Sequence, residues 1–349
     1  LYSDEDIANR TLYVEASRGC PFRCEFCLSS LDKTAWAFDT ARFLAEMEKL
    51  YSRGARSFKF VDRTFNLNTE SCLRILGFFL EKLRTAPDDP VFAHFEVIPD
   101  RLPDALKEAI RQFPVGSLQL EIGVQSFNPE VQARISRRQD NARSEENIRW
   151  LRKHSQAHLH ADLIIGLPGE TAESFAAGFD RLVGLHPHEI QVGMLKGLRG
   201  APILRHRDAV GLVFDPSPPY TLLSTADVDF LTMQRLARFA RFWDLIANSG
   251  RFSATLALIL ADAPFARFMA LSDWLYETGK TLHGIALGRL AAMVREWLIL
   301  TGTDQVLADG TIKQDYAGKA SLQTRQETGN HPLPNAPRQA HIRQRRHIG

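Results

Sequence analysis

Long apolar runs, cysteines and an excess of one charge are scarce in this sequence. No stretch approaches the ~20 uncharged residues that cross a bilayer, and the opening LYSDEDIANR lacks the apolar region of a signal peptide. Four cysteines in 349 residues are too few for a disulfide framework. The 43 basic and 41 acidic residues give a formal charge of +2, which indicates neither nucleic acid nor a membrane as a partner. We therefore expect a globular protein of the cytoplasm.

The first 200 residues or so alternate short apolar runs with longer segments of helical periodicity. This alternation is typical of βα units around a parallel sheet. Strand candidates cover residues 12–16, 57–61, 91–97, 117–124, 158–165 and 189–194, and helix candidates cover 41–52, 69–83, 103–112, 142–153 and 171–185. The six units predict an α/β fold, a partial (β/α)6 TIM-like barrel with a C-terminal all-helical domain.

Changes in composition predict the domain boundaries. We interpret residues 1–10 as a linker from a missing upstream domain, 11–205 as the barrel, and the proline-rich 206–223 as a second linker. Residues 224–306 are apolar and helical, without a convincing strand. Beyond 307 the apolar periodicity stops, and 331–349 hold four Arg, three His and no acidic residue. We expect 307–349 to be a disordered basic tail.

Three of the four cysteines lie within eight residues. Cys20, Cys24 and Cys27 have C-x₃-C-x₂-C spacing in the loop expected directly after the first strand, the end of a barrel strand at which chemistry takes place. Cys72 falls inside a helical pattern, and we predict a small buried side chain there rather than a fourth ligand. A cluster on three thiolates leaves one iron open, which favours catalysis over a structural role. The alternative, a zinc site, would need a further Cys or His nearby, and none lies at 28–33.

This cysteine motif resembles that of the radical S-adenosylmethionine (SAM) superfamily, in which an aromatic residue precedes the last cysteine, as Phe26 does here. The resemblance implies a [4Fe–4S] cluster on Cys20, Cys24 and Cys27, with SAM chelating the open iron. One electron from the reduced cluster would break a C–S bond of SAM, and the resulting 5′-deoxyadenosyl radical would abstract hydrogen from substrate. A one-electron donor such as flavodoxin or ferredoxin is implied, and the substrate would be a small molecule or a peptide.

The loop after the second predicted strand is where members of the superfamily contact the SAM amino group, often with a Gly-Gly-Glu segment. Here the segment from Phe58 to Asn66 lacks those residues. By position, Asp62 would accept from the SAM ammonium. The alternative is an ordinary loop carboxylate.

The segment LEIGVQSFN at 120–128, with Ile-Ser-Arg at 135–137, resembles a motif of one large branch of the superfamily. That branch includes oxygen-independent coproporphyrinogen oxidases, methylthiotransferases and cobalamin-dependent enzymes. By position, Glu121 and Gln125 would face SAM or substrate, and Arg137 would pair with the SAM carboxylate. Ser136 replaces the Asn of the branch, so Arg138 or a surface ion pair for Arg137 stays an alternative.

The fifth and sixth predicted strands add weaker matches. The Gly-Leu-Pro-Gly-Glu-Thr turn that begins at Gly166 resembles the one that brings backbone close to adenosine in the superfamily. Leu195, after the sixth strand, would lie on the adenine side. His94, His158 and His160 are on predicted strands, and we interpret them as core or surface residues rather than substrate bases.

Residues 1–305 are similar to a narrower group, in which a cobalamin-binding domain precedes the barrel and an uncharacterised helical domain follows it. The sequence contains no Asp-x-His-x-x-Gly loop, which such a cobalamin domain carries. We expect a piece of a cobalamin-dependent enzyme, a methyltransferase whose methyl donor domain is absent from this sequence, rather than a cobalamin-free enzyme. Two alternative hypotheses remain: an iron–sulfur electron-transfer or binding module, and a methylthiotransferase.

Overall fold

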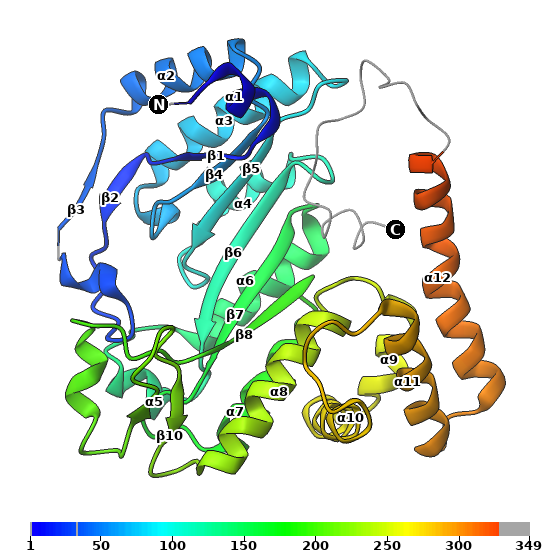
Figure 1. Ribbon diagram of the computed structural model, residues 1–349. Helices are drawn as coiled ribbons and strands as arrows, with labels where there is room; N and C mark the ends of the chain where they lie inside the picture. Colours follow the sequence, from blue (N-terminus) through cyan, green and yellow to red (C-terminus); the bar gives the residue numbers. More distant parts are fainter. Residues whose placement is uncertain (1, 33, 328–349) are drawn as a thin grey trace.

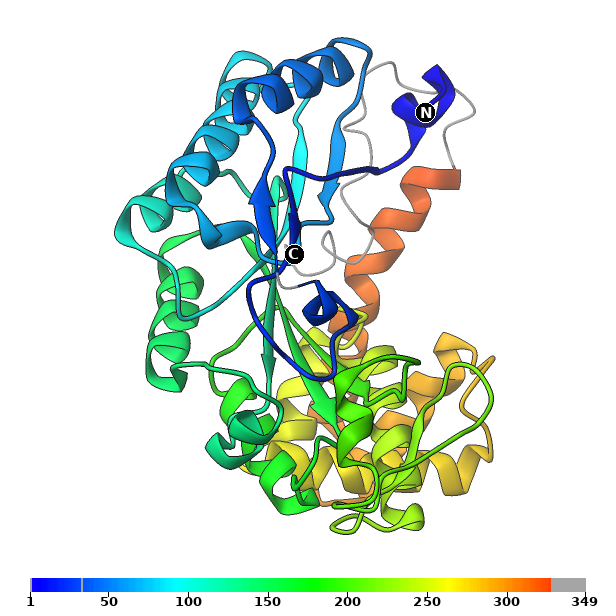
Figure 2. The same cartoon turned by 90° about the vertical axis from the view of Figure 1, so that its left-hand side faces the viewer.

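Six parallel strands form the centre of the molecule. The computed structural model describes residues 2–32 and 34–327 (Figure 1). The sheet has the order β1-β4-β5-β6-β7-β8, with β1 Leu12–Val14, β4 Ser57–Phe60, β5 Phe92–Val97, β6 Leu118–Gln125, β7 His158–Ile165 and β8 Glu189–Met194. Spatial order follows chain order, as in a barrel built from successive βα units. The curved sheet stays open between β1 and β8 among the described residues (Figure 2), so the predicted partial barrel is confirmed.

The crossover helices begin where the sequence provides capping side chains. They are α2 Thr40–Ser52, α3 Thr69–Thr85, α4 Asp104–Arg111, α6 Asn141–His154 and α7 Ala172–Val183. Asp39, Asn68, Asp140 and Thr171 each accept a hydrogen bond from the backbone N–H three residues later, which satisfies a donor that the helix itself leaves free. The bounds agree with the predicted ones to within two residues.

The segment after β1 differs from the prediction. The strand expected at 12–16 ends at Val14, and β2 (Ser17–Gly19) then pairs antiparallel with β3 (Ala35–Ala37). The loop that carries the cysteines is therefore an excursion from a two-stranded ribbon, and it contains the short helix η1 (Leu28–Leu31). Gly19 has φ +84°, and a Cβ there would lie 1.8 Å from the Thr34 carbonyl oxygen, so only glycine fits at the base of the loop.

The two predicted linkers are folded. Residues 4–9 form α1 (Asp4–Asn9), and Ile7 is 1% exposed within the apolar core. The second segment contains the hairpin β9 (Val213–Phe214) and β10 (Leu222–Ser224), preceded by η3 (Pro202–His206). Buried apolar side chains such as Ile7 and Leu222 hold these segments in place, and single residues of this kind give no periodic signal. Two further short helices, α5 (Pro129–Arg134) and η2 (Phe65–Leu67), also escaped prediction.

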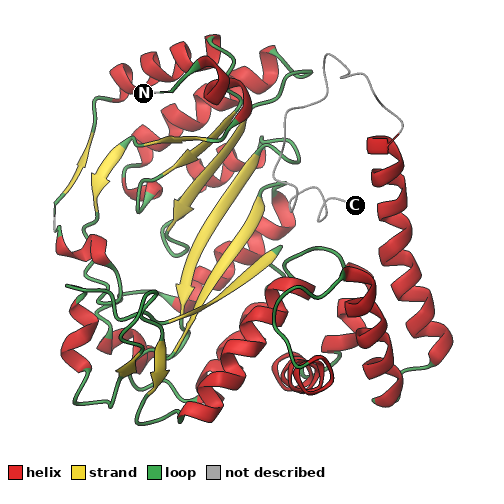
Figure 3. Ribbon diagram, in the orientation of Figure 1, coloured by secondary structure: helices red, strands yellow, loops and turns green. Residues whose placement is uncertain are grey.

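The C-terminal part is helical, as predicted, and it packs on the edge of the sheet (Figure 3). It comprises α8 Phe230–Ile246, α9 Ser253–Leu260, α10 Pro264–Gly279, α11 Leu287–Leu300 and α12 Gln305–Glu327. Trp243 Nε1 donates to the Ile190 carbonyl oxygen at 2.9 Å, and Asn248 Oδ1 accepts from the Ile190 N–H at 3.0 Å. These side chains occupy backbone groups of β8 that would otherwise be an open sheet edge.

The prediction of a disordered tail from 307 is wrong for the residues that the structure describes. Helix α12 continues to Glu327, and Asp315 accepts from the backbone N–H groups of Ala254 and Thr255 at 2.9 and 3.0 Å. This carboxylate caps the start of α9 from another helix. The long-range contact leaves no periodic pattern in the sequence. The remainder of the predicted tail, 328–349, lies outside the described residues.

Within the described residues, no single helix combines the length and apolar composition needed to span a membrane; α9 and α10 do so only when joined, across a bend of 105°.

Candidate active site

The three clustered cysteines open into one cavity at the carboxyl end of the sheet, where their loop meets β5, β6 and β7. All three are free thiols; Cys24 is buried and Cys20 and Cys27 are half-buried. We call this space, of about 180 Å³, the cysteine cavity. It is lined by Cys20, Phe22, Cys24, Phe26, Cys27, Arg63, Thr64, Glu96, Val97, Ile98, Glu121, Gly123, Gln125, Arg137, Arg138, Gln139 and Asp162. Phe26, Glu121, Gln125 and Arg137 are thus brought together with the cysteines, as predicted.

The three free thiols are ligands of the kind that an iron–sulfur cluster takes. Among the described residues, no three His, Cys, Asp or Glu side chains are close enough to hold one metal ion, which disagrees with a closed zinc site. A [4Fe–4S] cluster takes each thiolate on a different iron and so accepts wider spacing. Burial raises the pKa of Cys24, and the nearby Arg137 guanidinium opposes that shift. Arg137 therefore favours the thiolate that a cluster requires.

Cys72 does not join the other thiols. It is 1% exposed within α3, and its Sγ donates to the Phe65 carbonyl oxygen at 2.9 Å. Burial raises its pKa to about 12, so the thiol stays protonated. The prediction of a small buried side chain is confirmed.

Arg137 connects the cysteine loop with strand β6. Its Nη1 lies 3.6 Å from Cys24 Sγ, its Nε donates to Gln139 Oε1 at 3.0 Å, and its Nη2 donates to the Gly123 carbonyl oxygen. A Cβ on Gly123 would lie 2.7 Å from Gln125 Nε2. Glycine at 123 therefore keeps space for Gln125, which ends β6 with φ +69°. The cavity thus holds a guanidinium and an amide with polar atoms close to the thiols.

Glu121 is a carboxylate with a histidine and a lysine beside it. Its Oε2 lies 3.0 Å from His94 Nε2 and 3.3 Å from Lys59 Nζ. Burial alone would raise the pKa of Glu121, but His94 and Lys59 outweigh it and hold the pKa at about 2. Glu121 is therefore ionised at neutral pH. His94 is a partner of this carboxylate, in agreement with its interpretation as a core residue.

Two further acids in the cavity were missed in the sequence. Glu96 on β5 is opposite Glu121 in the strand register, and Asp162 on β7 is opposite Gly123. Burial raises the pKa of Glu96 to about 7 and raises that of Asp162, whose Oδ1 lies 3.2 Å from His160 Nε2. Alternation along the strands could have revealed both acids, because side chains two residues apart on a strand share a face. Glu96 therefore shares a face of β5 with His94, and Asp162 shares a face of β7 with His160.

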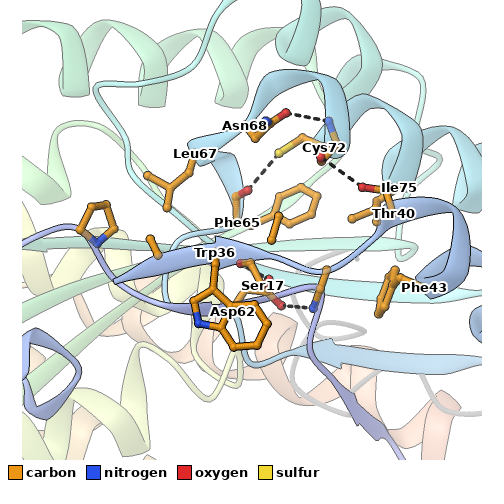
Figure 4. Close-up of a pocket in the computed structure, with 15 residues that line it drawn as sticks. Ser17, Trp36, Thr40, Phe43, Asp62, Phe65, Leu67, Asn68, Cys72 and Ile75 are labelled. Atoms are coloured by element: carbon orange, nitrogen blue, oxygen red, sulfur yellow. Dashed lines mark hydrogen bonds between the residues drawn. The ribbon is translucent and has the colours of Figure 1, made fainter. Parts of the chain in front are cut away.

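Asp62 lies in a different place from the one predicted. It lines a second space of about 320 Å³, the hairpin cavity, between the β2–β3 ribbon and helices α2 and α3 (Figure 4). Ser17 Oγ donates to Oδ1 at 2.5 Å and the Ala16 N–H to Oδ2 at 2.9 Å. Both oxygens are thus engaged by the chain itself. Its neighbours Arg63 and Thr64 line the cysteine cavity instead.

Gly166 and Leu195 also lie outside the lining of the cysteine cavity. Gly166 has φ +86°, and a Cβ there would lie 2.2 Å from Leu222 Cδ2, so this glycine allows β10 to approach the end of β7. Leu195 is 2% exposed, and its N–H donates to the Ile165 carbonyl oxygen at 3.0 Å. In this structure the contacts of both residues are packing contacts at the ends of β7 and β8.

The cysteine loop is anchored by Glu25, which the sequence analysis did not single out. This carboxylate accepts from Ser136 Oγ at 2.6 Å, lies 2.7 Å from His206 Nε2 and pairs with Arg205. Its own N–H donates to the Ile135 carbonyl oxygen at 3.0 Å. One buried side chain between Cys24 and Cys27 thus ties the loop to η3 and to the turn after α5. Ser136, the departure from the branch motif, is the residue that contacts it.

A parallel barrel with three free thiols at its carboxyl end is the architecture of a radical SAM domain. Residues 14–182 match the Radical SAM superfamily, and residues 208–342 match a family described as protein of unknown function (DUF4080). The chain therefore contains a radical SAM domain, followed by a region whose family has no assigned role.

Individual relatives match over shorter stretches. An uncharacterised methyltransferase of Pyrococcus horikoshii is 29% identical over 171 residues, covering 47% of this chain and 35% of that protein. The oxygen-independent coproporphyrinogen III oxidase of Escherichia coli is 41% identical over 81 residues, 22% of this chain and 17% of that protein. The chain thus matches about a third or less of the length of these relatives.

Among solved structures, the radical SAM methyltransferase TsrM of Kitasatospora setae, with tryptophan substrate and a SAM analogue bound, has a TM-score of 0.51 at 17% identity. The superposition covers 60% of this chain and 40% of that one. At this identity the likeness shows a shared fold.

Proposed function

We propose that this radical SAM domain holds a [4Fe–4S] cluster on Cys20, Cys24 and Cys27 and cleaves SAM reductively. The observation that carries the proposal is the convergence of three free thiols, Arg137 and Glu121 on one cavity. The bound cluster would supply the electron for cleavage of the sulfonium. In this proposal Phe26 packs beside the cluster, since it lines the same cavity.

The chain's own residues would orient SAM within the cysteine cavity. Arg137 offers a guanidinium to the SAM carboxylate, for which its planar fork of donors is suited. The acids Glu96, Glu121 and Asp162 offer acceptors for the hydroxyl and ammonium groups of SAM. Asp62 lies outside the cysteine cavity and accepts hydrogen bonds from Ser17 and Ala16, so in this proposal its predicted contact with the ammonium passes to these acids.

We infer further that the reaction is a methyl transfer in which cobalamin, bound by a domain outside this chain, takes part. The methyltransferase names of the Pyrococcus and Kitasatospora proteins support this inference. Cysteine chemistry of this kind suits the reducing cytoplasm. Copurification of a corrinoid with the protein produced from its complete natural gene is the test; its consistent absence would remove cobalamin from the proposal.

The SAM cleavage itself is tested without oxygen. The chain would be reconstituted with iron and sulfide, reduced with dithionite in the presence of SAM, and assayed by chromatography for 5′-deoxyadenosine. We expect 5′-deoxyadenosine with about four irons per chain. A reduced cluster by electron paramagnetic resonance without that product would instead favour an electron-transfer or binding module. A methylthiolated product would favour a methylthiotransferase.

A further inference from the structure

A third cavity lies against the other side of the cysteine loop. It has a volume of about 800 Å³, and its lining includes Phe22, Arg23, Arg101 and Arg138. We call it the arginine cavity. Its lining contains no acidic residue and no residue of the six-stranded sheet, whereas strand residues form much of the cysteine cavity. The arginine cavity is thus formed by the cysteine loop, by α5 and by the turn after it, and it adjoins the cysteine cavity through Phe22, Arg137 and Arg138.

The arginine side chains in this cavity are available to a partner. Arg23, Arg101 and Arg138 are exposed, and in the described part of the chain none of them pairs with a carboxylate. The Arg101 guanidinium lies 5.2 Å from the centre of the Phe22 ring, which leaves its N–H donors free at the ring face. Gathering unpaired like charges in a chain of net charge +2 costs energy, and an acidic partner would offset that cost.

Only a thin part of the protein separates the arginine cavity from the thiols. Cys20 and Cys24 line the cysteine cavity, and Pro21 and Arg23, between them in sequence, line the arginine cavity. Phe22, Arg137 and Arg138 line both. Only side chains of the cysteine loop and its neighbours would therefore separate a redox partner bound at the arginine cavity from a cluster bound to these thiols.

We propose that the arginine cavity is the docking site for an acidic one-electron donor protein that reduces the cluster. This inference rests on the proposed function, which requires such a donor. In each encounter the donor, a reduced flavin or iron–sulfur protein, loses one electron and the cluster gains it. The exposed arginines steer the negatively charged donor to the face of the loop behind the cluster.

The test uses the double variant Arg23→Glu/Arg101→Glu of the reconstituted chain, with Arg289→Glu as a matched control. Neither of the two arginines lines the cysteine cavity, and Arg289 is an exposed arginine on α11. Reduced flavodoxin would be mixed with each protein without oxygen, and reduction of the cluster followed by absorbance. We expect the double variant to be reduced about tenfold more slowly at low salt, and the control to match wild type.

Two further measurements separate this inference from the proposed function. Titration with flavodoxin should show binding about tenfold weaker for the double variant, whether or not SAM is cleaved. With dithionite as reductant, both variants should yield as much 5′-deoxyadenosine as wild type. If flavodoxin reduced the double variant as fast as wild type, the docking site would be overturned. It would also be overturned if the double variant yielded less 5′-deoxyadenosine than wild type with dithionite. Absence of 5′-deoxyadenosine from wild type with dithionite would instead overturn SAM cleavage.

Discussion

The cysteine cavity and the hairpin cavity flank the same loop, and each is lined by a carboxylate that the resemblance to radical SAM enzymes assigns to SAM or substrate. Glu121 has His94 and Lys59 beside it, and the hydrogen bond from His94 together with the charge of Lys59 holds its pKa at about 2. Asp62 has only neutral donors, and burial raises its pKa. The environment of Glu121 suits a charged ligand. The Asp62 carboxylate instead stabilises the chain around it. Position in a motif did not distinguish these two carboxylates. Their hydrogen-bonding and charged partners did.

The thiols offer the strongest way to break this comparison. Substituting Cys20, Cys24 or Cys27 by alanine should abolish iron binding and SAM cleavage, because in the proposed function each supplies one cluster ligand. Cys72→Ser, in the hairpin cavity, should leave iron content unchanged. Iron and sulfide analysis after reconstitution checks both. A normal cluster in the triple alanine variant would refute the assignment of the cysteine cavity.

The two carboxylates should respond to pH in opposite directions. Because the pKa of Glu121 is depressed, its contribution is present above the usual value of 4.5 and is lost as pH falls toward 2. Glu121→Gln should therefore lower the free energy of unfolding by about 2–3 kcal/mol at pH 7, and by little near pH 2. Chemical denaturation of the apoprotein across this range is the measurement.

For Asp62 the sign reverses. Its raised pKa means that ionisation costs stability as pH rises from the usual value of 3.8 through the folded pKa. Asn has one acceptor oxygen where Asp62 uses two, so Asp62→Asn should be less stable than wild type, but by a smaller margin at pH 8 than at pH 4. If Asp62→Asn instead lost stability most at high pH, the two environments would not differ as described.

A change at Arg137 sharpens the role of the cysteine cavity. Arg137→Ala should weaken SAM binding about tenfold, since a charge-assisted hydrogen bond contributes roughly 1.5 kcal/mol or more, and iron content should be unchanged. Equilibrium dialysis with the reconstituted protein measures the affinity. Unaltered affinity would move the carboxylate contact to Arg138, which lines the same cavity.

The smallest effect is expected at the hairpin cavity. Trp36 is 48% exposed, lines this cavity and has its ring centre 4.9 Å from that of Phe38. Trp36→Ala should cost about 1 kcal/mol of stability through the lost aromatic pair, with SAM affinity and iron content retained. A large fall in SAM affinity would show that the hairpin cavity takes part in binding.

The barrel was predictable because its signals are local. Short apolar runs for the strands and helical periodicity between them predicted the elements to within two residues, and the cysteine spacing indicated the site. Contacts distant in sequence carried no such signal. Asp62 lines the hairpin cavity because Ala35–Ala37 pairs with β2 to form the ribbon above it. Helix α12 is held in place by Asp315, which caps the start of α9. Both depend on how separate segments meet.

The clamp on Glu25 has a consequence for the order of biosynthesis. Glu25 and His206 are 181 residues apart in the chain, so the loop that bears the thiols is translated long before the residues that fix it. During translation, three unprotected thiols emerge from the ribosome without a finished binding site. In the proposed function, insertion of iron and sulfide would therefore follow the synthesis of η3 and its closure on the loop, and until then the thiols would need protection from oxidation.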